Sequence, residues 1–574
     1  MNILGINGLG IAPAACLVQD GRLTAMAEEE RFTRIKGSFG IMPAHAAGFC
    51  LDFAHIRTLD EIDYIAFPWD THKYLFFMPY FFLRTYLLYA KKTGSGSLIP
   101  AIKELYKYQR GNVIRCIEVM LRTAGFSGKI PPVIFIPHHL AHAACAFYTS
   151  GFEEADILII DGSGEEKCTS VFLGKNFALH QAHSFSIPHS LGWFYQSLTE
   201  FLGFTPNQGE GKLMGLAGYG NYDPSIHSLL KKMISFDADG NYRYDATYSF
   251  LGSHSQGTVY SDRMVSLLGP ARIEPDTFTQ KYKNIAFSAQ YILEEITGRL
   301  VRILSSRGGF SGKLCLAGGV TLNCKMNGEI ATQEYIDDLF VPPVPHDAGA
   351  ALGAALYAAK EKGDRPDTVF EHPYYGPEFS DHQIYSALKE HSLTFQHEPD
   401  IAGKVAHLLF QEKIVAWFQG RMEIGPRALG ARSIVANPAK VSTRDLVNAI
   451  KKREPWRPLA PSLLDREKDA YLVTSRQSPF MAIACEMSAQ GKIKTPAVVH
   501  VDGTTRPHLV SEKNNPRYWK LISEFEKLSG IPLILNTSFN IGKEPIVCTP
   551  TDAIRTFIRS DLHYLAIGDY LVRK

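Results

Sequence analysis

Three histidines within five residues form the clearest group of side chains that could do chemistry. They stand in the run Pro137–Ala144, where a strand is expected to give way to a helix. His138 and His142 are four residues apart, so a helix places them on one face, about 6 Å apart along its axis. That spacing suits two ligands of one metal ion. A buried histidine pair without a metal is the alternative.

Two aspartates are the candidates to complete this site. Asp161 follows the apolar strand Ile157–Ile160, and Asp347 stands at the end of another expected strand. With His138 and His142 they form a set of intermediate hardness, which leaves positions open for substrate oxygens. We expect Fe2+ there, with Zn or Mn as alternatives, and Mg2+ bound with ATP.

Cationic side chains in loops form a second group, in the C-terminal part of the chain. Arginine forks in glycine-rich loops match phosphate or carboxylate with two parallel hydrogen bonds. Interleaved Gly, Pro and Trp argue against a solvated basic face, and a net charge of +2 argues against a nucleic-acid groove. The group consists of Arg421, Arg427, Lys451, Lys452, Arg453, Arg457 and Arg506.

An internal repeat indicates the fold of the N-terminal part. Residues 3–24 and 157–180 share the order strand, glycine-rich turn, strand, tight turn, strand, with Asn7 and Asp161 as the first polar turn residues. Such a duplicated hairpin is typical of the actin, sugar-kinase and Hsp70 fold, whose two turns grip the phosphates of ATP. Two unrelated hairpins are the alternative.

Glycines at strand ends extend this prediction to a nucleotide site. Paired glycines before a helix let backbone N–H groups approach a phosphate. A second glycine-rich stretch, Asn207–Gly220, contains one lysine and suits a nucleotide, with a flexible loop as the alternative. The expected nucleotide-binding residues are Gly164, Gly209, Gly211, Lys212, Gly318, Gly319 and Asn323.

The bulk properties predict a cytoplasmic α/β protein of two domains. A chain of 574 residues is too long for one core. Residues 360–381 read as a linker, so we place domains at 1–380 and 381–574. Nine cysteines without a Cys-x-x-Cys pair argue against zinc ribbons and a disulfide framework. The N-terminus reads as a strand and not a signal peptide.

One apolar stretch, Tyr74 to Ala90, tests the expectation that no segment spans a membrane. It is interrupted by Pro79 and Arg84, so we expect a buried or lid helix, with a membrane-surface helix as the alternative.

Several motifs together resemble one enzyme family over nearly the whole chain, the O-carbamoyltransferases of antibiotic and nodulation-factor biosynthesis. The resemblance implies an N-terminal domain like the tRNA threonylcarbamoyl transferases and a C-terminal YrdC-like α/β domain. The motifs are Glu28–Arg34, His138–His142, Gly209–Gly215, Gly425–Gly430, Trp456–Ser462, Thr505–Pro507 and Leu535–Asn540.

The resemblance also implies a mechanism in two steps. The YrdC-like domain makes carbamoyl-adenylate from carbamoyl phosphate and ATP, and the metal site passes the carbamoyl group to a hydroxyl of a small-molecule acceptor. His139 joins Arg427, Lys451, Arg457 and Arg506 as an expected catalytic residue. The residues expected to bind carbamoyl phosphate or the adenylate are Arg427, Lys451, Arg457, His500, Arg506, Asn536 and Ser538.

One position departs from the family pattern. Relatives carry a His-Asp pair in the first hairpin turn, as a base for the acceptor hydroxyl, where this chain has Ile11-Ala12. His139 and the cluster Glu28–Glu30 are the replacements to consider. A threonylcarbamoyl-type tRNA modification enzyme is the main alternative function, and it would need a broad basic stripe. A hydrogenase-maturation carbamoyltransferase would need zinc fingers, and an ATP-binding sensor would release no AMP.

Overall fold

The structure is a computed structural model that describes residues 1–79, 105–237, 241–249, 259–275, 277–306, 309–473 and 479–574. The chain forms two compact units. The first contains Met1–Arg22, Phe39–Val341 and Pro345–Val369, and the second contains Leu23–Ser38, Pro342–Val344 and Phe370–Lys574. Most of the predicted helix Tyr74 to Ala90 lies outside the described residues. Within the described ranges, no helix is both long and apolar enough to cross a membrane.

The first unit contains two sheets with the same strand order. In one sheet β2, β1, β4 and β5 are neighbours, and in the other β7, β6, β11 and β12 are neighbours. In each, the first two are antiparallel and the rest run parallel. The predicted internal repeat is therefore present as a repeated topology. The strands are β1 (Asn2–Asn7), β2 (Ala14–Gln19), β4 (Tyr64–Phe67), β5 (Val133–Phe135), β6 (Glu154–Gly164), β7 (Lys167–Lys175), β8 (Ala178–Ser186), β11 (Lys313–Ala317) and β12 (Asp338–Phe340).

Helices cover these sheets. The central strands are therefore buried on both faces, as in β6, where Ile157–Ile160 are all buried. A small hairpin of β9 (Ile234–Phe236) and β10 (Tyr242–Tyr244) follows α9. The helices of the first unit are α2 (Ala44–Phe53), α5 (Arg110–Thr123), α6 (His138–Ser150), α7 (Leu191–Phe201), α8 (Glu210–Ala217), α9 (Pro224–Lys231), α10 (Asp262–Leu268), α11 (Gln280–Ser305), α12 (Cys324–Ala331) and α13 (Asp347–Glu361).

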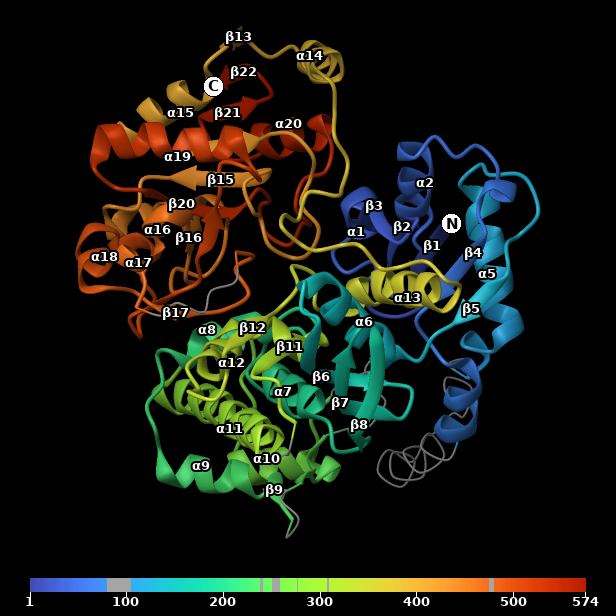
Figure 1. The fold of residues 1–574 in the computed structure, drawn as a ribbon. Coiled ribbons are helices and arrows are strands. Elements are labelled where there is room, and N and C mark those ends of the chain that lie inside the picture. Colours follow the sequence, from blue (N-terminus) through green and yellow to red (C-terminus); the bar gives the residue numbers. More distant parts are fainter. Residues whose placement is uncertain (80–104, 238–240, 250–258, 276, 307–308, 474–478) are drawn as a thin grey trace. The chain divides into compact units, whose positions relative to one another are not determined.

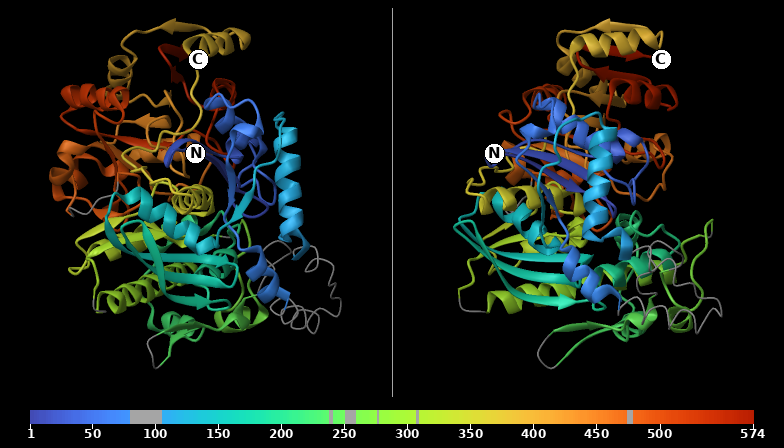
Figure 2. Two further views of the ribbon diagram at one scale, coloured as in Figure 1. Left: turned by 45° about the vertical axis from the view of Figure 1, so that its right-hand side comes forward. Right: turned by 90° about the vertical axis from the view of Figure 1, so that its right-hand side faces the viewer.

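Two helices, α6 and α13, pack closely against each other (Figures 1 and 2). Helix α13 also contacts β1 and β2, and α6 contacts β6 and β11. The approach depends on small residues, since a Cβ atom added to Gly353 would lie 1.8 Å from the carbonyl oxygen of Ala141. The pair thereby holds the N-termini of α6 and α13 near the end of β6.

The second unit is built on an eight-stranded mixed sheet. Its order is β13-β22-β21-β14-β15-β20-β16-β19. Helices α15 and α19 pack together in this unit. The strands are β13 (Phe395–His397), β14 (Val415–Phe418), β15 (Arg432–Ala436), β16 (Ala460–Leu464), β19 (His508–Val510), β20 (Leu533–Ser538), β21 (Tyr564–Ile567) and β22 (Tyr570–Arg573), with a small pair of β17 (Cys485–Glu486) and β18 (Thr504–Thr505). The helices are α14 (Asp381–Glu390), α15 (Ile401–Phe410), α16 (Val441–Ile450), α17 (Lys468–Tyr471), α18 (Ala489–Lys494), α19 (Pro516–Ser529) and α20 (Pro550–Ile558).

A short N-terminal segment belongs to this second unit. Leu23–Ser38 includes most of β3 (Arg22–Glu28) and all of α1 (Glu30–Thr33). Arg34 donates to the carbonyl oxygens of Pro545 and Ile546, which explains the grouping. The α/β class expected from the sequence is confirmed. The YrdC-like character of the second unit, and the division of tasks at residue 380, stay predictions.

Candidate functional site

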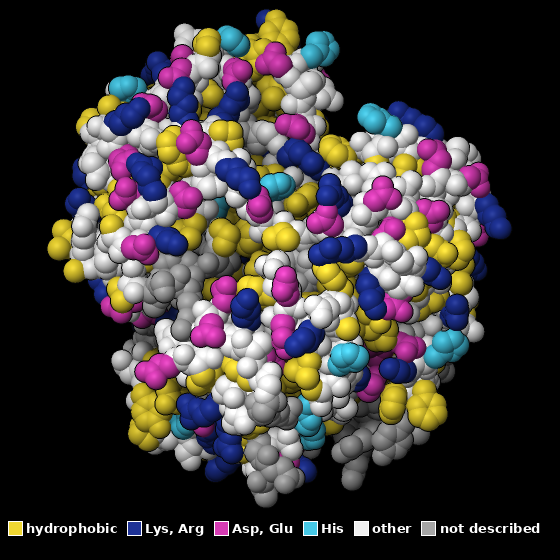
Figure 3. Space-filling view, viewed as in Figure 1, with side chains coloured by type: hydrophobic (Ala, Val, Ile, Leu, Met, Phe, Trp, Pro, Cys, Tyr) yellow, Lys and Arg dark blue, Asp and Glu magenta, His cyan; other side chains and the backbone are white. Residues whose placement is uncertain are grey.

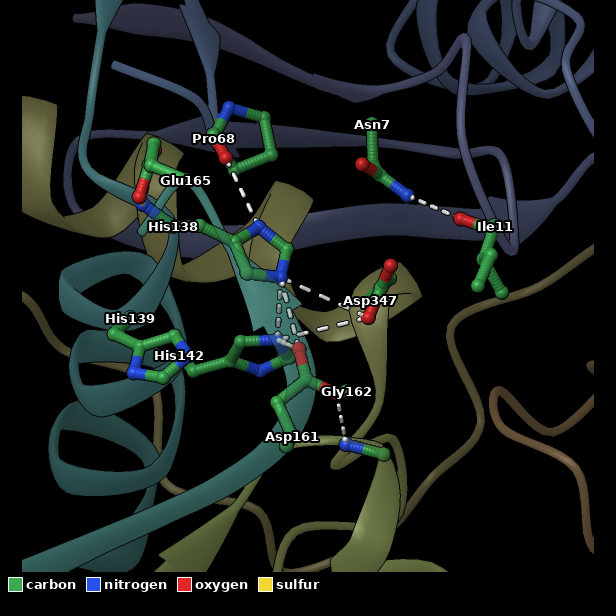
Figure 4. A network of polar contacts seen from close by, with 12 residues as sticks. Asn7, Ile11, Pro68, His138, His139, His142, Asp161, Gly162, Glu165 and Asp347 are labelled. Carbon is green, nitrogen blue, oxygen red and sulfur yellow. Dashed lines mark hydrogen bonds and ion pairs between the residues drawn. The ribbon is translucent and has the colours of Figure 1, made fainter. Parts of the chain in front are cut away.

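Four side chains of the first unit converge on one point, and they are the four that the sequence predicts as metal ligands. His138, His142, Asp161 and Asp347 offer ligand atoms that all lie within 4.8 Å of one another. The Nε2 atoms of the two histidines are 3.1 Å apart. The Oδ2 atom of Asp161 lies 3.2 Å from Nε2 of His138, and Oδ1 of Asp347 lies 3.7 Å from Nε2 of His142. Figure 4 shows the convergence.

The local folds that bring these side chains together are simple. Helix α6 begins at His138, directly after Pro137, so the i, i+4 pair shares its first turn. Asp161 lies near the carboxyl end of strand β6, and Asp347 is the first residue of α13. The prediction that a strand ends at Asp347 is wrong. Strand β12 ends at Phe340, and a loop leads from it to the start of α13.

Hydrogen bonds around the histidines test whether the set fits a metal. Nδ1 of His138 lies 3.1 Å from the carbonyl oxygen of Pro68, which can only accept, so Nδ1 carries the proton. In the neutral ring Nε2 then presents a lone pair toward Nε2 of His142. Two imidazole nitrogens and two carboxylates at such distances need a cation between them, either a proton or a metal ion. The donor set therefore fits a divalent metal.

Asp161 is fixed by the backbone as well as by the histidines. Its Oδ1 accepts the N–H of Gly319 at 3.0 Å. Gly318 has φ 94°, and a Cβ there would lie 2.3 Å from the carbonyl oxygen of Ile160. The Gly318–Gly319 pair thus allows the loop after β11 to reach Asp161. Burial disfavours the charged form of His138, but Asp161 and Asp347 outweigh it and raise its pKa well above the usual range.

His139 points away from the four converging groups. Its Nδ1 lies 2.7 Å from the hydroxyl of Ser170, and its Nε2 has no hydrogen-bond partner among the described residues. Burial holds the pKa of His139 well below its usual range. The other suggested base, the cluster Glu28–Glu30, lies in the second unit, where Glu28 and Glu30 both pair with buried Arg31. These carboxylates serve to hold that segment together.

Several of the predicted nucleotide-binding residues have packing roles. A Cβ on Gly164 would lie 2.6 Å from the ring of His138, and one on Gly209 would lie 2.7 Å from Phe204. Gly211 and Lys212 lie in helix α8, so this part of the stretch does not form the flexible loop considered as the alternative. Lys212 stands over the ring of Phe204.

Asn323 is used internally. Its amide exchanges two hydrogen bonds with Gln290 and accepts the N–H of Met326 at the start of α12. Contact of these residues with a nucleotide stays a prediction.

In the second unit, three arginines crowd one another. Burial and the charge of Arg457 lower the pKa of Arg453 to about 9, Glu454 opposes them, and Arg506 lowers it further. Nε of Arg506 is buried and bonds to no residue that the structure describes. Two cations and one carboxylate around Arg453 leave positive charge that an anion would relieve. Arg453 belongs to the cationic group that the sequence indicates, but it is not among the residues expected to bind carbamoyl phosphate.

Lys451 has a different setting from the one expected. Its Nζ donates to the carbonyl oxygen of Ser538 and to two oxygens of Asn540, at 2.9 and 2.8 Å. Burial, Arg453 and Arg457 lower its pKa well below the usual range. Lys451 therefore holds the turn after β20, and contact with a phosphate requires it to exchange one of these acceptors.

The remaining predicted binding residues belong to β20 and to two loops. Asn536 and Ser538 both belong to β20, and Asn536 is buried. Nδ1 of His500 lies 3.1 Å from the hydroxyl of Thr504. Arg427 is half-buried, one residue before Ala428, whose carbonyl accepts from Asn536 at 3.0 Å.

Two arginines of the glycine-rich loops are structural. Arg432 is fully buried, stacks 3.7 Å from the ring centre of Phe418 and donates to the carbonyls of Gln419 and Pro377. Arg421 donates to the carbonyls of Gly376 and Tyr375. Backbone carbonyls thus occupy both guanidinium groups, and the expected contact of Arg421 with an anion would require it to give up one of these acceptors.

Comparisons with known proteins bear on both units. Residues 2–356 match the family model described as carbamoyltransferase N-terminus, and residues 406–574 match carbamoyltransferase C-terminus. An uncharacterized protein of Synechocystis, sll1178, is 35% identical over 100% of this chain and 97% of its own length. Nodulation protein NolNO of Sinorhizobium fredii is 36% identical over 98% of this chain and 78% of its own length.

Similarity to solved structures is weaker. The activator of 2-hydroxyisocaproyl-CoA dehydratase from Clostridium difficile, with bound ADPNP, has a TM-score of 0.32 and 14% identity. It covers 63% of this chain and 95% of its own.

Proposed function

The chain belongs to the carbamoyltransferase family, and from that premise we propose an ATP-dependent enzyme that forms carbamoyl-adenylate in its second unit and transfers the carbamoyl group to a hydroxyl in its first. The observation that carries this proposal is the separation of two sites of different chemistry. Crowded arginines, suited to phosphates, lie in the second unit, and a histidine–aspartate cluster, suited to a metal, lies in the first.

The first reaction uses the arginines. Carbamoyl phosphate has no free carboxylate oxygen. Water therefore attacks first, the bond between the carbamoyl oxygen and phosphorus breaks, and inorganic phosphate and carbamate are released. A carbamate oxygen then attacks the α-phosphorus of ATP, the bond to the β-phosphate breaks, and pyrophosphate leaves. The phosphates are bound by Arg427, Arg457 and Arg506. Arg453 joins them, because a bound anion would offset its repulsion by the neighbouring arginines. Lys451 positions Ser538 and Asn540 beside them.

The second reaction belongs to the first unit. The acceptor's hydroxyl oxygen attacks the carbamoyl carbon, the bond to AMP breaks, and the hydroxyl proton passes to a base. His138, His142, Asp161 and Asp347 would hold a divalent metal, with Fe2+ ahead of Zn or Mn, and such an ion would polarise a carbamoyl or phosphate oxygen. His139 stays the proposed base, with Nδ1 held by Ser170.

The acceptor is proposed to be a small molecule with a free hydroxyl. The tRNA-modifying alternative calls for a broad basic stripe. On the face drawn in Figure 3, Lys and Arg side chains are intermixed with Asp and Glu side chains, so that face carries no such stripe.

A mass measurement tests the proposed function. Pooled hydroxylated metabolites, carbamoyl phosphate and ATP are incubated with the protein, and the products are searched for a gain of one CONH unit. A gain that needs both cosubstrates is expected. ATP consumption without any carbamoylated product would contradict the transfer step.

A further inference from the structure

The hydroxyl of Ser462 is the centre of a buried polar network in the second unit. Ser462, Tyr518 and Asn536 are at most 1% exposed, and His508 is 4% exposed. The hydroxyl of Tyr518 donates to Oγ of Ser462 at 3.0 Å, and Nδ2 of Asn536 donates to it at 2.8 Å. Nδ1 of His508 lies 3.0 Å from the same oxygen. Four elements, β16, β19, α19 and β20, thus meet at one serine.

With Tyr518 and Asn536 as donors, the proton of Ser462 has one direction open to it. A serine hydroxyl accepts two hydrogen bonds and donates one. Asn536 and Tyr518 take both acceptor positions of Ser462, so its proton points to Nδ1 of His508, which must be the unprotonated nitrogen. Burial lowers the pKa of His508 to about 3, which agrees with a neutral ring.

The orientation of the Asn536 amide follows from its second contact. Nδ2 also donates to the carbonyl oxygen of Ala428 at 3.0 Å. A carbonyl only accepts, so a flipped amide would face oxygen against oxygen. Oδ1 of Asn536 therefore points the other way, and it is buried without a hydrogen-bond partner in the part of the chain that the structure describes.

An unpaired buried carbonyl oxygen is unfavourable unless a ligand meets it. Asn536 and Ser538 are two residues apart on β20, so their side chains lie on one face of the sheet. Oγ of Ser538 lies 3.3 Å from Nζ of Lys451, and Ala428 directly follows Arg427. The unpaired oxygen is therefore on the strand face that carries the proposed carbamoyl-phosphate residues.

We propose that Ser462, with Tyr518 and His508, is a positioning residue that fixes Oδ1 of Asn536 as the acceptor for the NH2 group of carbamoyl phosphate. The network would thereby select carbamoyl phosphate over acyl phosphates of similar size that lack an N–H. Acetyl phosphate is the direct comparison, because its methyl group replaces the NH2 group and leaves Oδ1 unpaired. This inference rests on the proposed function.

The test compares the two acyl phosphates as substrates for pyrophosphate release from ATP. In Ser462→Ala, Nδ2 of Asn536 loses one acceptor and the amide is free to turn. We expect the ratio of kcat/KM for carbamoyl phosphate over acetyl phosphate to fall at least about tenfold, mainly through a higher KM for carbamoyl phosphate. Ser462→Thr keeps the hydroxyl and should restore most of the ratio.

Ser560→Ala is the matched control. Ser560 is a buried serine of the same unit whose hydroxyl donates to the carbonyl of Phe557, so its loss should leave the ratio unchanged. If Ser462→Ala does not unfold cooperatively, Asn536→Ala decides instead, because it removes the acceptor itself. A wild-type ratio in a folded Ser462→Ala or Asn536→Ala protein would overturn the inference.

Calorimetric binding separates this inference from the proposed reaction. Wild-type protein that binds carbamoyl phosphate in preference to acetyl phosphate, but releases no pyrophosphate, would contradict the reaction and support the network. Equal binding of the two acyl phosphates by the wild-type protein would overturn the network's role even if pyrophosphate is released.

Discussion

The Nε2 atoms of His138 and His142 lie 3.1 Å apart, while Nδ1 of His138 is tied to the carbonyl of Pro68. The close approach of two ring nitrogens beside two carboxylates needs a positive charge to hold it. The arrangement comes from one turn of α6 and from the helix crossing that brings Asp347 alongside. It supports the proposed metal-dependent step in the first unit, whose residues are separate from the arginines of the second unit.

His142→Ala should remove one ligand and lower metal affinity by about 10- to 100-fold or more. We expect the variant to lose carbamoyl transfer and to keep pyrophosphate release, because the arginines are untouched. Metal content by mass spectrometry and both activities would be measured together. Loss of pyrophosphate release with intact transfer would reverse the assignment of the two units.

The crossing of α6 and α13 can be tested with a single methyl group. Gly353→Ala places a Cβ 1.8 Å from the carbonyl oxygen of Ala141. The helices must separate, which we expect to cost about 1–3 kcal/mol of unfolding free energy and to weaken metal binding. Gly298→Ala, in α11 with no atom within 4 Å, is the control and should be neutral or stabilising. Equal stability and metal affinity of both variants would refute the crossing.

The anion site is tested at Arg506 and Arg427. Arg506→Ala or Arg427→Ala should lower pyrophosphate release at least about 100-fold, because a charge-assisted phosphate contact is lost in the transition state. The melting temperature should stay near that of the wild type. Arg466→Ala, which breaks exposed ion pairs with Glu526 and Glu467 and a contact with the Trp519 ring outside this group, should leave pyrophosphate release unchanged. Normal release by both site variants would refute the site.

The neutral ring of His508 predicts a pH-dependent stability. Its pKa is about 3 in the folded protein, below the ordinary value near 6.5. The contribution of the neutral His508 ring to the free energy of unfolding is therefore complete above about pH 6.5 and is lost as the pH falls toward 3. Over this range only the unfolded chain takes up the proton. The His508→Gln variant lacks this titration. The difference in unfolding free energy between the wild type and this variant should therefore shrink by about 2 kcal/mol between pH 7 and pH 5. Denaturant unfolding at both pH values measures this; a constant difference would contradict it.

Local rules account for the parts of the fold and site that the sequence predicts well. The i, i+4 spacing of His138 and His142, and the place of Asp161 after an apolar run, depend only on helix and strand periodicity. The repeated hairpins are equally local, since each strand and turn is close in sequence to the next.

Long-range contacts account for the parts of the fold and site that the sequence does not predict. Arg432 and Arg427 stand in the same loop, and only the folded chain places carbonyls of Gln419 and Pro377 around Arg432. Lys451 likewise meets oxygens of Asn540, far along the sequence. Polar groups buried by distant segments take whichever acceptors the fold supplies, and no spacing rule announces them.

The identity of the nucleotide product decides whether the protein forms carbamoyl-adenylate. Purified protein with ATP and carbamoyl phosphate, and no acceptor, is analysed for AMP-type and ADP-type products. We expect pyrophosphate together with carbamoyl-adenylate or its hydrolysis product AMP, only when carbamoyl phosphate is present, in the wild-type and His142→Ala proteins alike. Formation of ADP and inorganic phosphate in place of pyrophosphate would contradict it.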